Sequence, residues 1–460
     1  DGTADDTQQF WIQFRLAQDI SNPPAPIESP KTRAGETELV KTDNEVKIES
    51  LVGVLFDTDN SGNPKSLVAF SRAADSDIVG PTDKLTTVRL NMGLNTLYKR
   101  EQKYRLYVFA NLPGTSDANY AALKAAQGKS FSTVQQMVAA IPYSYPAENK
   151  GIALGTSVED GLKIMVWLKQ GEKYDEQHPY IVQVESSDPE NASKNDATLS
   201  LTPMQARFDF VSRPGISDFT YPVNFVVDDE EKPEIKVKFV NYNVVSPAMQ
   251  VYYFQNGKVS DKSIASPASG LSAQTSLLSS LYSSIYVPEF VPSVAGNKKL
   301  KFADVTYIAL RAVPVVDATC TAPKDVKDAI NSANAATKAA TPLWYYDDGQ
   351  FQSGLTTASH DGESNWHKIT YDPELRDYGL NYYHAVRHSA GADDDIYSGL
   401  EYGVVRNYIY QIGIESVSAL PHPFDPQTTP VENNREDISL RINPPKEWFY
   451  HRIGTTLTFD

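Results

Sequence analysis

This chain of 460 residues is poor in cysteine, in long apolar runs and in positive charge. Cys320 is the single cysteine, so neither an intrachain disulfide nor a thiolate-rich metal site is expected. The net charge of −16 argues against a nucleic-acid partner, because phosphates would repel such a surface. No run of about 18 apolar residues occurs, so no membrane span is expected. These features favour an exposed, extracellular protein. Because the chain begins at Asp1 instead of Met, we expect that a leader was either removed or left out of this sequence.

Motifs for catalysis and for metal binding are also missing. The chain has no G-x-S-x-G, no Walker loop, no G-x-G-x-x-G and no Cys–His nucleophile pair. Residues 57–62 resemble a calcium loop, but Val68 stands at its twelfth position, where a carboxylate is needed, so we predict a hairpin turn. His384 and His388 have the spacing of a helical zinc pair within a segment of strand-like composition. We therefore expect no enzyme, no cofactor and no metal.

The composition favours strands separated by turns. There are 26 Tyr, 29 Pro and 25 Gly, and the length is too great for one hydrophobic core. We predict a mainly β protein with a few short helices, divided into residues 1–33 (a first strand and a linker), an N-terminal β-sandwich domain at 34–205 and a C-terminal one at 206–460. Strands are expected at 46–56, 85–90, 104–111, 162–168, 180–184, 199–210, 221–227, 235–242, 249–254, 305–313, 380–388, 408–417 and 438–442. Helices are expected within 120–141 and 325–340.

The first thirty residues combine a strand pattern with a polar linker. Phe10, Ile12, Phe14 and Leu16 alternate with other residues, which is typical of a half-buried strand. Residues 21–30 contain four prolines and are followed by a polar stretch of the kind that proteases cut. From spacing alone, an ordinary N-terminal edge strand is the simpler interpretation.

Four stretches carry a resemblance to a known family. Residues 404–417 begin Val-Val-Arg-Asn and continue as an alternating strand, which resembles a signature of the Bacteroidales fimbrillins (type V pilins), especially Mfa-like shaft subunits. Residues 104–112 resemble that family's N-domain strand ending in Asn, and residues 304–312 resemble a central strand of its C-domain. Residues 438–442 followed by Trp448 resemble its terminal strands, although residues 443–447 depart from the usual single Pro before the Trp. The order of these stretches spans nearly the whole chain.

The resemblance implies a fold, a location and a mechanism. It implies two tandem transthyretin-like sandwiches, export as an outer-membrane lipoprotein precursor, and a place in a surface fimbrium that supports adhesion and virulence. It further implies that an Arg-specific protease cuts between Arg33 and Ala34, which removes the strand of Phe10, Ile12, Phe14 and Leu16. A C-terminal segment of another subunit would then fill the groove by strand exchange. The apolar face of this donor strand would consist of Phe449, Ile453, Leu457 and Phe459.

Expected partners are therefore other copies of the chain, accessory fimbrial subunits, the protease, and host proteins or glycans. A second hypothesis is a fimbrial tip adhesin or a surface glycan-binding lipoprotein, for which residues 344–346 and Trp366 are the candidate aromatics. A hydrolase built on a sandwich would need a pocket with perturbed carboxylates, which no sequence pattern identifies.

Overall fold

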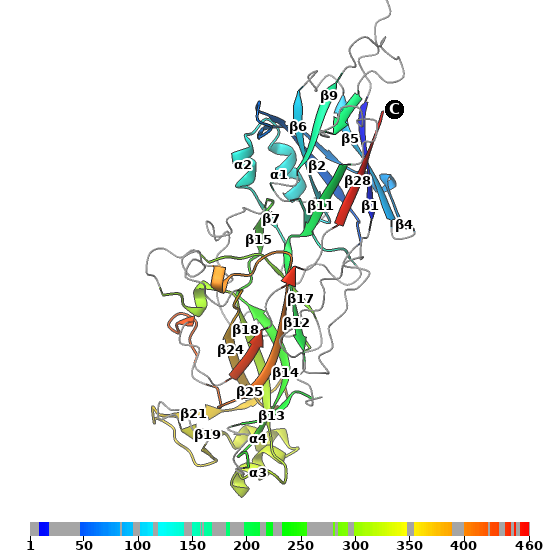
Figure 1. Ribbon diagram of the computed structural model, residues 1–460. Coiled ribbons are helices and arrows are strands. Elements are labelled where there is room, and N and C mark those ends of the chain that lie inside the picture. The colour runs from blue at the N-terminus through cyan, green and yellow to red at the C-terminus, as the bar shows by residue number, and fades with distance from the viewer. Residues whose placement is uncertain are drawn as a thin grey trace, which may run out of the picture.

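A computed structural model gives the fold of the chain. It describes residues 9–17, 47–82, 85–94, 102–113, 118–141, 150–156, 158, 161–167, 181–184, 197–211, 218–223, 232–254, 279–280, 284–292, 299–346, 354–388, 400–421, 424–431, 438–442, 446–447 and 451–459. The protein is mainly β, and its two β-sandwich domains lie end to end, the N-terminal one at the top of Figure 1. No helix in these residues is long and apolar enough to cross a membrane.

Eleven strands in the described part of the chain form the hydrogen-bonded network of the N-terminal domain. Along the main path the order is β10-β9-β6-β8-β11-β28-β1-β5-β4, with β2 paired to β6 and β3 paired to β2. Their bounds are β1 Gln9–Ala17, β2 Leu51–Thr58, β3 Pro64–Arg72, β4 Ile78–Thr82, β5 Leu85–Leu94, β6 Lys103–Ala110, β8 Leu154–Gly155, β9 Leu162–Trp167, β10 Ile181–Val184, β11 Ala197–Pro203 and β28 His451–Phe459. A short 3-10 helix, η2 (Asp75–Asp77), precedes β4.

Strand β2 has an almost unbroken apolar sequence because both of its faces are covered. Leu51 and Leu55 lie in a core with residues of β5 and β6. Val52, Val54 and Phe56 lie in a second core on the opposite face, under helices α1 (Ala118–Ala125) and α2 (Phe131–Gln135). The N-terminal domain is thus a layered structure with a core on each side of β2.

The helical stretch expected within 120–141 forms two helices, because the chain breaks between α1 and α2. Gly128 has a left-handed backbone conformation, with φ +81, and it follows the end of the first helix. Ser130 then begins α2 as its N-cap, and its Oγ accepts a hydrogen bond from the backbone N–H of Thr133 at 3.2 Å. The remaining residues form strand β7 (Val138–Ala140), which pairs with β15 (Gln250–Tyr252) and so links the two domains.

The C-terminal domain packs two five-stranded sheets against a shared aromatic core. One sheet has the order β17-β12-β25-β26 with β27 beside β25, and the other has β13-β14-β18-β24 with β16 beside β14. Their bounds are β12 Gln205–Val211, β13 Thr220–Pro222, β14 Lys236–Val245, β16 Ser279–Ser280, β17 Ile285–Pro288, β18 Tyr307–Val315, β24 Leu380–Ala385, β25 Tyr408–Val417, β26 Ile438–Ile442 and β27 Lys446–Glu447. Short 3-10 helices lie at η8 (Phe302–Asp304) and η9 (Leu400–Tyr402).

The segment expected as one strand at 199–210 divides into two strands that belong to different domains. Strand β11 ends at Pro203, and β12 begins at Gln205 in the other sandwich. Between them, Met204 is fully buried and its N–H donates to the carbonyl oxygen of Ala153 at 2.8 Å. The chain therefore crosses between the domains within a single buried residue.

Small elements form the far end of the C-terminal domain, at the bottom of Figure 1. They are α3 Lys324–Asn331, α4 Ala335–Ala340, β19 Leu343–Tyr346, β20 Leu355–Thr356, β21 Trp366–Ile369, β22 Tyr371–Asp372 and β23 Asp377–Tyr378. The helix expected at 325–340 is interrupted, because Asn334 begins α4 as a new N-cap and its Oδ1 accepts from the N–H of Ala336 at 2.9 Å.

Candidate functional site: the paired terminal strands

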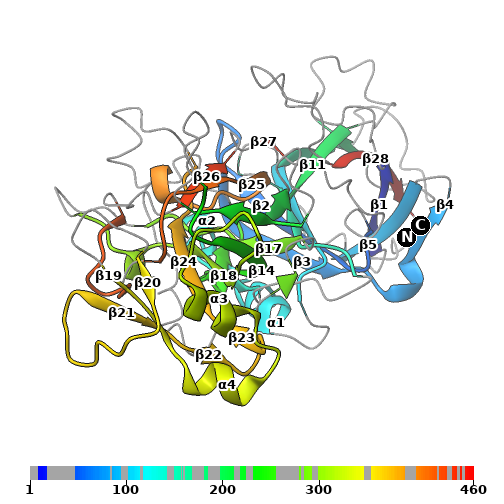
Figure 2. The same cartoon turned by 90° about the horizontal axis from the view of Figure 1, so that it is seen from below.

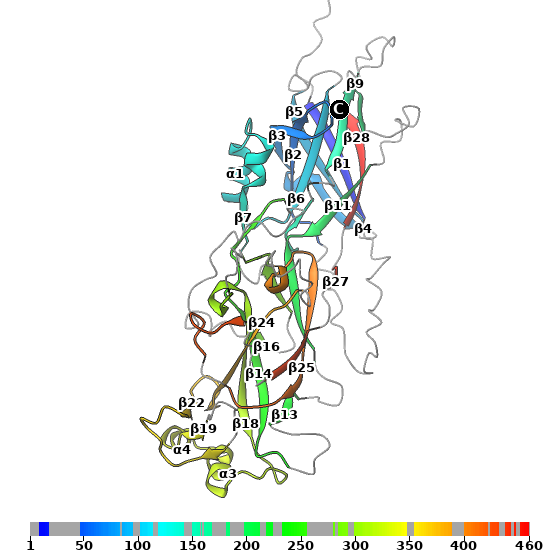
Figure 3. The ribbon, with the colours of Figure 1, turned by 60° about the vertical axis from the view of Figure 1, so that its left-hand side comes forward.

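The first and the last strand of the chain lie side by side in the N-terminal sheet. In Figures 1 and 3 the blue β1 and the red β28 are neighbours, and Figure 2 places them together when the molecule is seen from below. Strand β28 lies between β11 and β1, and it is antiparallel to both. Strand β1 lies between β28 and β5, and it is also antiparallel to both. Both terminal strands therefore have a partner on each edge.

The register brings together the residues that were expected to act as the displaced strand and the donor strand. Phe10, Ile12, Phe14 and Leu16 are all on β1, and Ile453, Leu457 and Phe459 are all on β28. The directly opposite pairs are Phe10 with Phe459, Ile12 with Leu457, and Leu16 with Ile453. Arg33, Ala34 and Phe449 lie outside the described residues, so the cleavage site and the start of the donor segment stay predictions.

The strand on the other side of β1 belongs to the N-terminal core. Ile12 lies opposite Leu90 and Phe14 lies opposite Val88, and both of these β5 side chains are fully buried. Loss of β1 would leave the edges of β5 and β28 without a partner. An unpaired strand edge presents a row of free N–H and C=O groups that can bind another strand.

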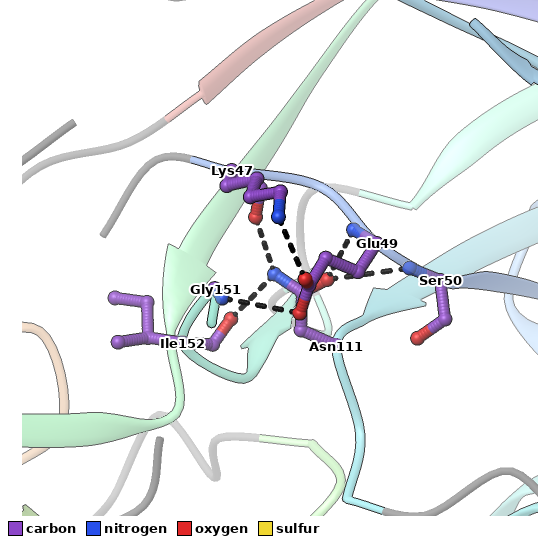
Figure 4. Close-up of polar contacts among 6 residues, drawn as sticks. All are labelled: Lys47, Glu49, Ser50, Asn111, Gly151 and Ile152. Carbon is purple, nitrogen blue, oxygen red and sulfur yellow. Dashed lines mark hydrogen bonds and ion pairs between the residues drawn. The ribbon is translucent and has the colours of Figure 1, made fainter. Parts of the chain in front are cut away.

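A buried asparagine holds the chain where it enters β2. The Oδ1 of Asn111 accepts hydrogen bonds from the backbone N–H groups of Glu49 and Ser50, at 2.7 and 3.3 Å. Its Nδ2 donates to the carbonyl oxygens of Lys47 and Ile152, at 2.7 and 2.9 Å (Figure 4). One side chain thus satisfies four backbone groups on two separate segments, and these residues are called the Asn111 network below.

Local backbone geometry explains why an asparagine and a glycine stand in this network. Asn111 has φ +54, in the left-handed region that asparagine tolerates better than most residues. A Cβ at Gly151 would lie 2.1 Å from the carbonyl oxygen of Lys47, so only glycine fits there. Glu49 adds an ion pair to the Nζ of Lys47 at 2.9 Å and lies 3.4 Å from the N–H of Gly151 (Figure 4). The sequence indicated Asn111 only as the end of a strand, and its contacts were not foreseen.

The Val-Val-Arg-Asn stretch forms the junction between the domains. Arg406 is buried and its Nε pairs with Glu289 Oε2 at 2.9 Å. Its terminal nitrogens donate to the carbonyl oxygens of Tyr252 and Tyr253, at 2.6 and 3.3 Å. Tyr253 packs in the N-terminal core, so this guanidinium connects the two sandwiches. Strand β25 begins directly after Asn407, whose φ is +63, in agreement with the strand predicted at 408–417, whereas the contacts of Arg406 were not predicted.

The turn at residues 57–62 and the strand that contains His384 form as predicted. Asp59 accepts from the N–H groups of Ser61 and Asn63 at 2.8 and 2.9 Å, which closes the turn between β2 and β3. His384 lies on strand β24, and burial lowers its pKa to about 4. The Nδ1 of His388 lies 2.8 Å from the Tyr410 hydroxyl, whose pKa is raised by burial. Among the described residues no group of three or more His, Cys, Asp or Glu is arranged to hold a metal ion.

The candidate aromatics for glycan binding lie in the small sheet at the far end of the C-terminal domain. Trp344 and Tyr345 are buried, whereas Tyr346 and Trp366 are half-buried. Trp366 is stacked on His360, with ring centroids 3.6 Å apart and planes 2° apart. These rings thus pack mainly on one another and on the domain core.

Comparison with known proteins gives one family match. Residues 376–452 match the model described as "Major fimbrial subunit protein type IV, Fimbrillin, C-terminal". The match runs from β23 to the start of β28 and includes the Arg406 junction. Among curated proteins, none matches the chain.

Solved structures with a related arrangement include two fimbrial proteins. One is the tip fimbrial protein Mfa3 from Porphyromonas gingivalis with a C-terminal truncation, with 11% identity, a TM-score of 0.35, and coverage of 88% of this chain and 96% of that one. The other is a fimbrial assembly protein from Parabacteroides distasonis, with 10% identity, a TM-score of 0.36, and coverage of 95% and 100%. Because these TM-scores are low, the family resemblance depends on residues 376–452. Over those residues, the chain is similar to the C-terminal part of the fimbrillins.

Proposed function

We propose that this protein is a non-enzymatic structural subunit of a bacterial surface fimbria, and that it polymerises by protease-triggered strand exchange. The observation that supports the proposal is the position of β1, which pairs with β28 along one edge and with β5 along the other and is followed in the sequence by the linker that contains Arg33. A cut after Arg33 would separate β1 from the body of the chain, and the sheet would then lack one strand in its middle. Burying a replacement strand would restore both ladders.

The Asn111 network supports the same proposal, because it protects the body of the chain from the cut. The linker was predicted within residues 1–33, and beyond it Asn111 binds the backbone of Lys47, Glu49 and Ser50. Strand β2, which follows, is buried on both faces. Removal of residues 1–33 would therefore leave the rest of the domain folded around β2.

The proposal includes a location and partners. The subunit would reach the cell surface as an outer-membrane lipoprotein precursor, meet an Arg-specific protease there, and assemble with copies of itself and with accessory fimbrial subunits. Host proteins or glycans would bind the finished fibre and not the isolated subunit.

Electron microscopy before and after cleavage tests the proposal. The purified chain should remain monomeric until an Arg-specific protease cuts after Arg33, and fibres should appear afterwards. The control is Arg33→Ala, which should stay monomeric under the same treatment. Fibres from the uncut Arg33→Ala variant, or monomers only from the cut wild type at high concentration, would contradict the proposal.

A further inference from the structure

A short segment from the second half of the chain completes one core of the N-terminal domain. Residues 249–254, called the junction segment below, follow β14 of the C-terminal domain, yet Tyr253 and Phe254 are fully buried in the core under α1 and α2. The ring centroid of Phe254 lies 4.9 Å from that of Tyr107 and 5.3 Å from that of Phe131. The two helices, called the helical layer below, therefore pack partly on rings that the C-terminal half supplies.

Hydrogen bonds tie the junction segment to the start of the helical layer. Strand β15, within the segment, pairs antiparallel with β7, and the two lie between the helices and the C-terminal domain in Figure 1. Asn119, in α1, binds both backbone groups of Ala140 in β7: its Oδ1 accepts from the N–H at 2.7 Å and its Nδ2 donates to the carbonyl oxygen at 2.9 Å. The carbonyl oxygen of Asn119 accepts from the Tyr253 hydroxyl at 2.9 Å. Helix α1, β7 and the junction segment thus form one bonded unit.

Arg406 holds the other side of the junction segment. Its guanidinium donates to the carbonyl oxygens of Tyr252 and Tyr253, and Glu289 fixes the guanidinium through the ion pair at Nε. Both charged residues are buried. Separating them would leave an uncompensated charge away from water, so the contact resists opening. Domains of one chain ordinarily move relative to one another unless their interface is large and apolar, and here buried rings and a buried ion pair oppose that motion.

We propose that docking of the two domains and folding of the helical layer are a single event, and that Arg406 is a positioning residue for that layer through the junction segment. While Arg406 holds the segment, Tyr253 and Phe254 lie beneath the helices. When the junction opens, both rings leave the core and the helices lose their packing surface. This role goes beyond fibre assembly and needs no cleavage, because it concerns the core on the face of β2 that is turned away from β5.

Hydrogen exchange in the full chain tests the proposal. In Arg406→Met, amides of residues 118–135 should exchange at least about tenfold faster than in wild type, whereas amides of β5 should change by less than about threefold. The matched control is Arg311→Met, which removes a buried arginine that pairs with Glu374 at 2.8 Å inside the C-terminal domain. It should leave residues 118–135 unchanged. Equal acceleration of these amides by both variants, or no acceleration by Arg406→Met, would overturn the proposal.

Tyr253→Phe is a conservative second variant that keeps the ring and all the contacts of Arg406. It removes only the hydroxyl that donates to Asn119, so exchange of residues 118–135 should rise by about 2- to 10-fold. Amides of β14 should be unchanged, because that strand belongs to the other sandwich. Unchanged exchange in the helical layer would show that the junction segment does not hold it.

A disulfide between β7 and β15 tests whether Arg406 acts through the junction segment. Ala140→Cys and Gln250→Cys are directly opposite and exposed, and Cys320→Ser leaves only this pair to join. Added to Arg406→Met, the oxidised pair should return the exchange of residues 118–135 to within about threefold of wild type, and reduction should restore fast exchange. Fast exchange in the oxidised protein would overturn the proposal, because the segment would then be held without stabilising the helices.

Discussion

The Asn111 network should contribute a large share of the stability of the N-terminal domain. Asn111→Ala removes four hydrogen bonds to backbone groups, each worth about 1 kcal/mol net. It also places alanine at φ +54, which costs about 1 kcal/mol more. Because some of these backbone groups can regain water at the partly exposed entry to β2, we expect a loss of roughly 3–5 kcal/mol in the free energy of unfolding.

Two matched variants separate the hydrogen bonds from the backbone strain. Asn111→Gly accepts the positive φ but lacks the side chain, so it should recover only the smaller part of the loss. Asn111→Asp keeps the two acceptor contacts but sets a carboxylate against the carbonyl oxygens of Lys47 and Ile152. That repulsion favours the protonated carboxyl in the folded state, so the Asp variant should gain stability relative to wild type as the pH is lowered.

Urea unfolding followed by near-ultraviolet circular dichroism measures these free energies, and hydrogen exchange locates the effect. Amides of residues 47–51 should lose protection in Asn111→Ala before those of β6. The difference should persist after cleavage at Arg33, because the network lies beyond the cut. A loss below about 1 kcal/mol for Asn111→Ala, or complete recovery in Asn111→Gly, would show that the four hydrogen bonds do not hold this segment.

Three further predictions follow from buried groups. Arg406→Met should lower the free energy of unfolding by about 3–5 kcal/mol, because it leaves the Glu289 carboxylate buried without its partner. The double variant with Glu289→Gln should lose less stability than the sum of the two single variants. Strict additivity of the three free energies in urea unfolding would contradict this. The free energy of unfolding should fall by up to about 2 kcal/mol between pH 7 and pH 5. The reason is that His384 in the unfolded chain takes up a proton near its ordinary pKa of 6.5, whereas in the folded chain its pKa is about 4. In thermal unfolding, His384→Gln should reduce this dependence on pH, and an unchanged dependence would contradict the assignment to His384. Gly151→Ala should lower the urea midpoint and disrupt the Lys47 contact, and an unchanged midpoint would mean that the backbone moves away without cost.

Local pattern was sufficient for many elements of this fold. Strands at 408–417 and 438–442 were predicted with the bounds that the structure has, because their alternation matches one buried face. Errors arose where a single residue interrupts a continuous pattern. Asn334 divides the helix expected at 325–340, and Met204 divides the expected strand between two domains, although the apolar pattern on either side of Met204 gives no sign of a break.

The sequence by itself determined the strand character of both terminal segments and the fimbrillin resemblance of residues 376–452, since each depends on residues that are close together along the chain. Only the tertiary structure decided that β1 and β28 are neighbours, with Phe10 opposite Phe459. A period of two residues specifies which face of a strand is apolar, but it does not specify the partner, because any apolar strand can satisfy that face. The same holds for Asn111 and Arg406: their types are visible in the sequence, but their roles come from backbone groups that only the folded chain brings within hydrogen-bond distance.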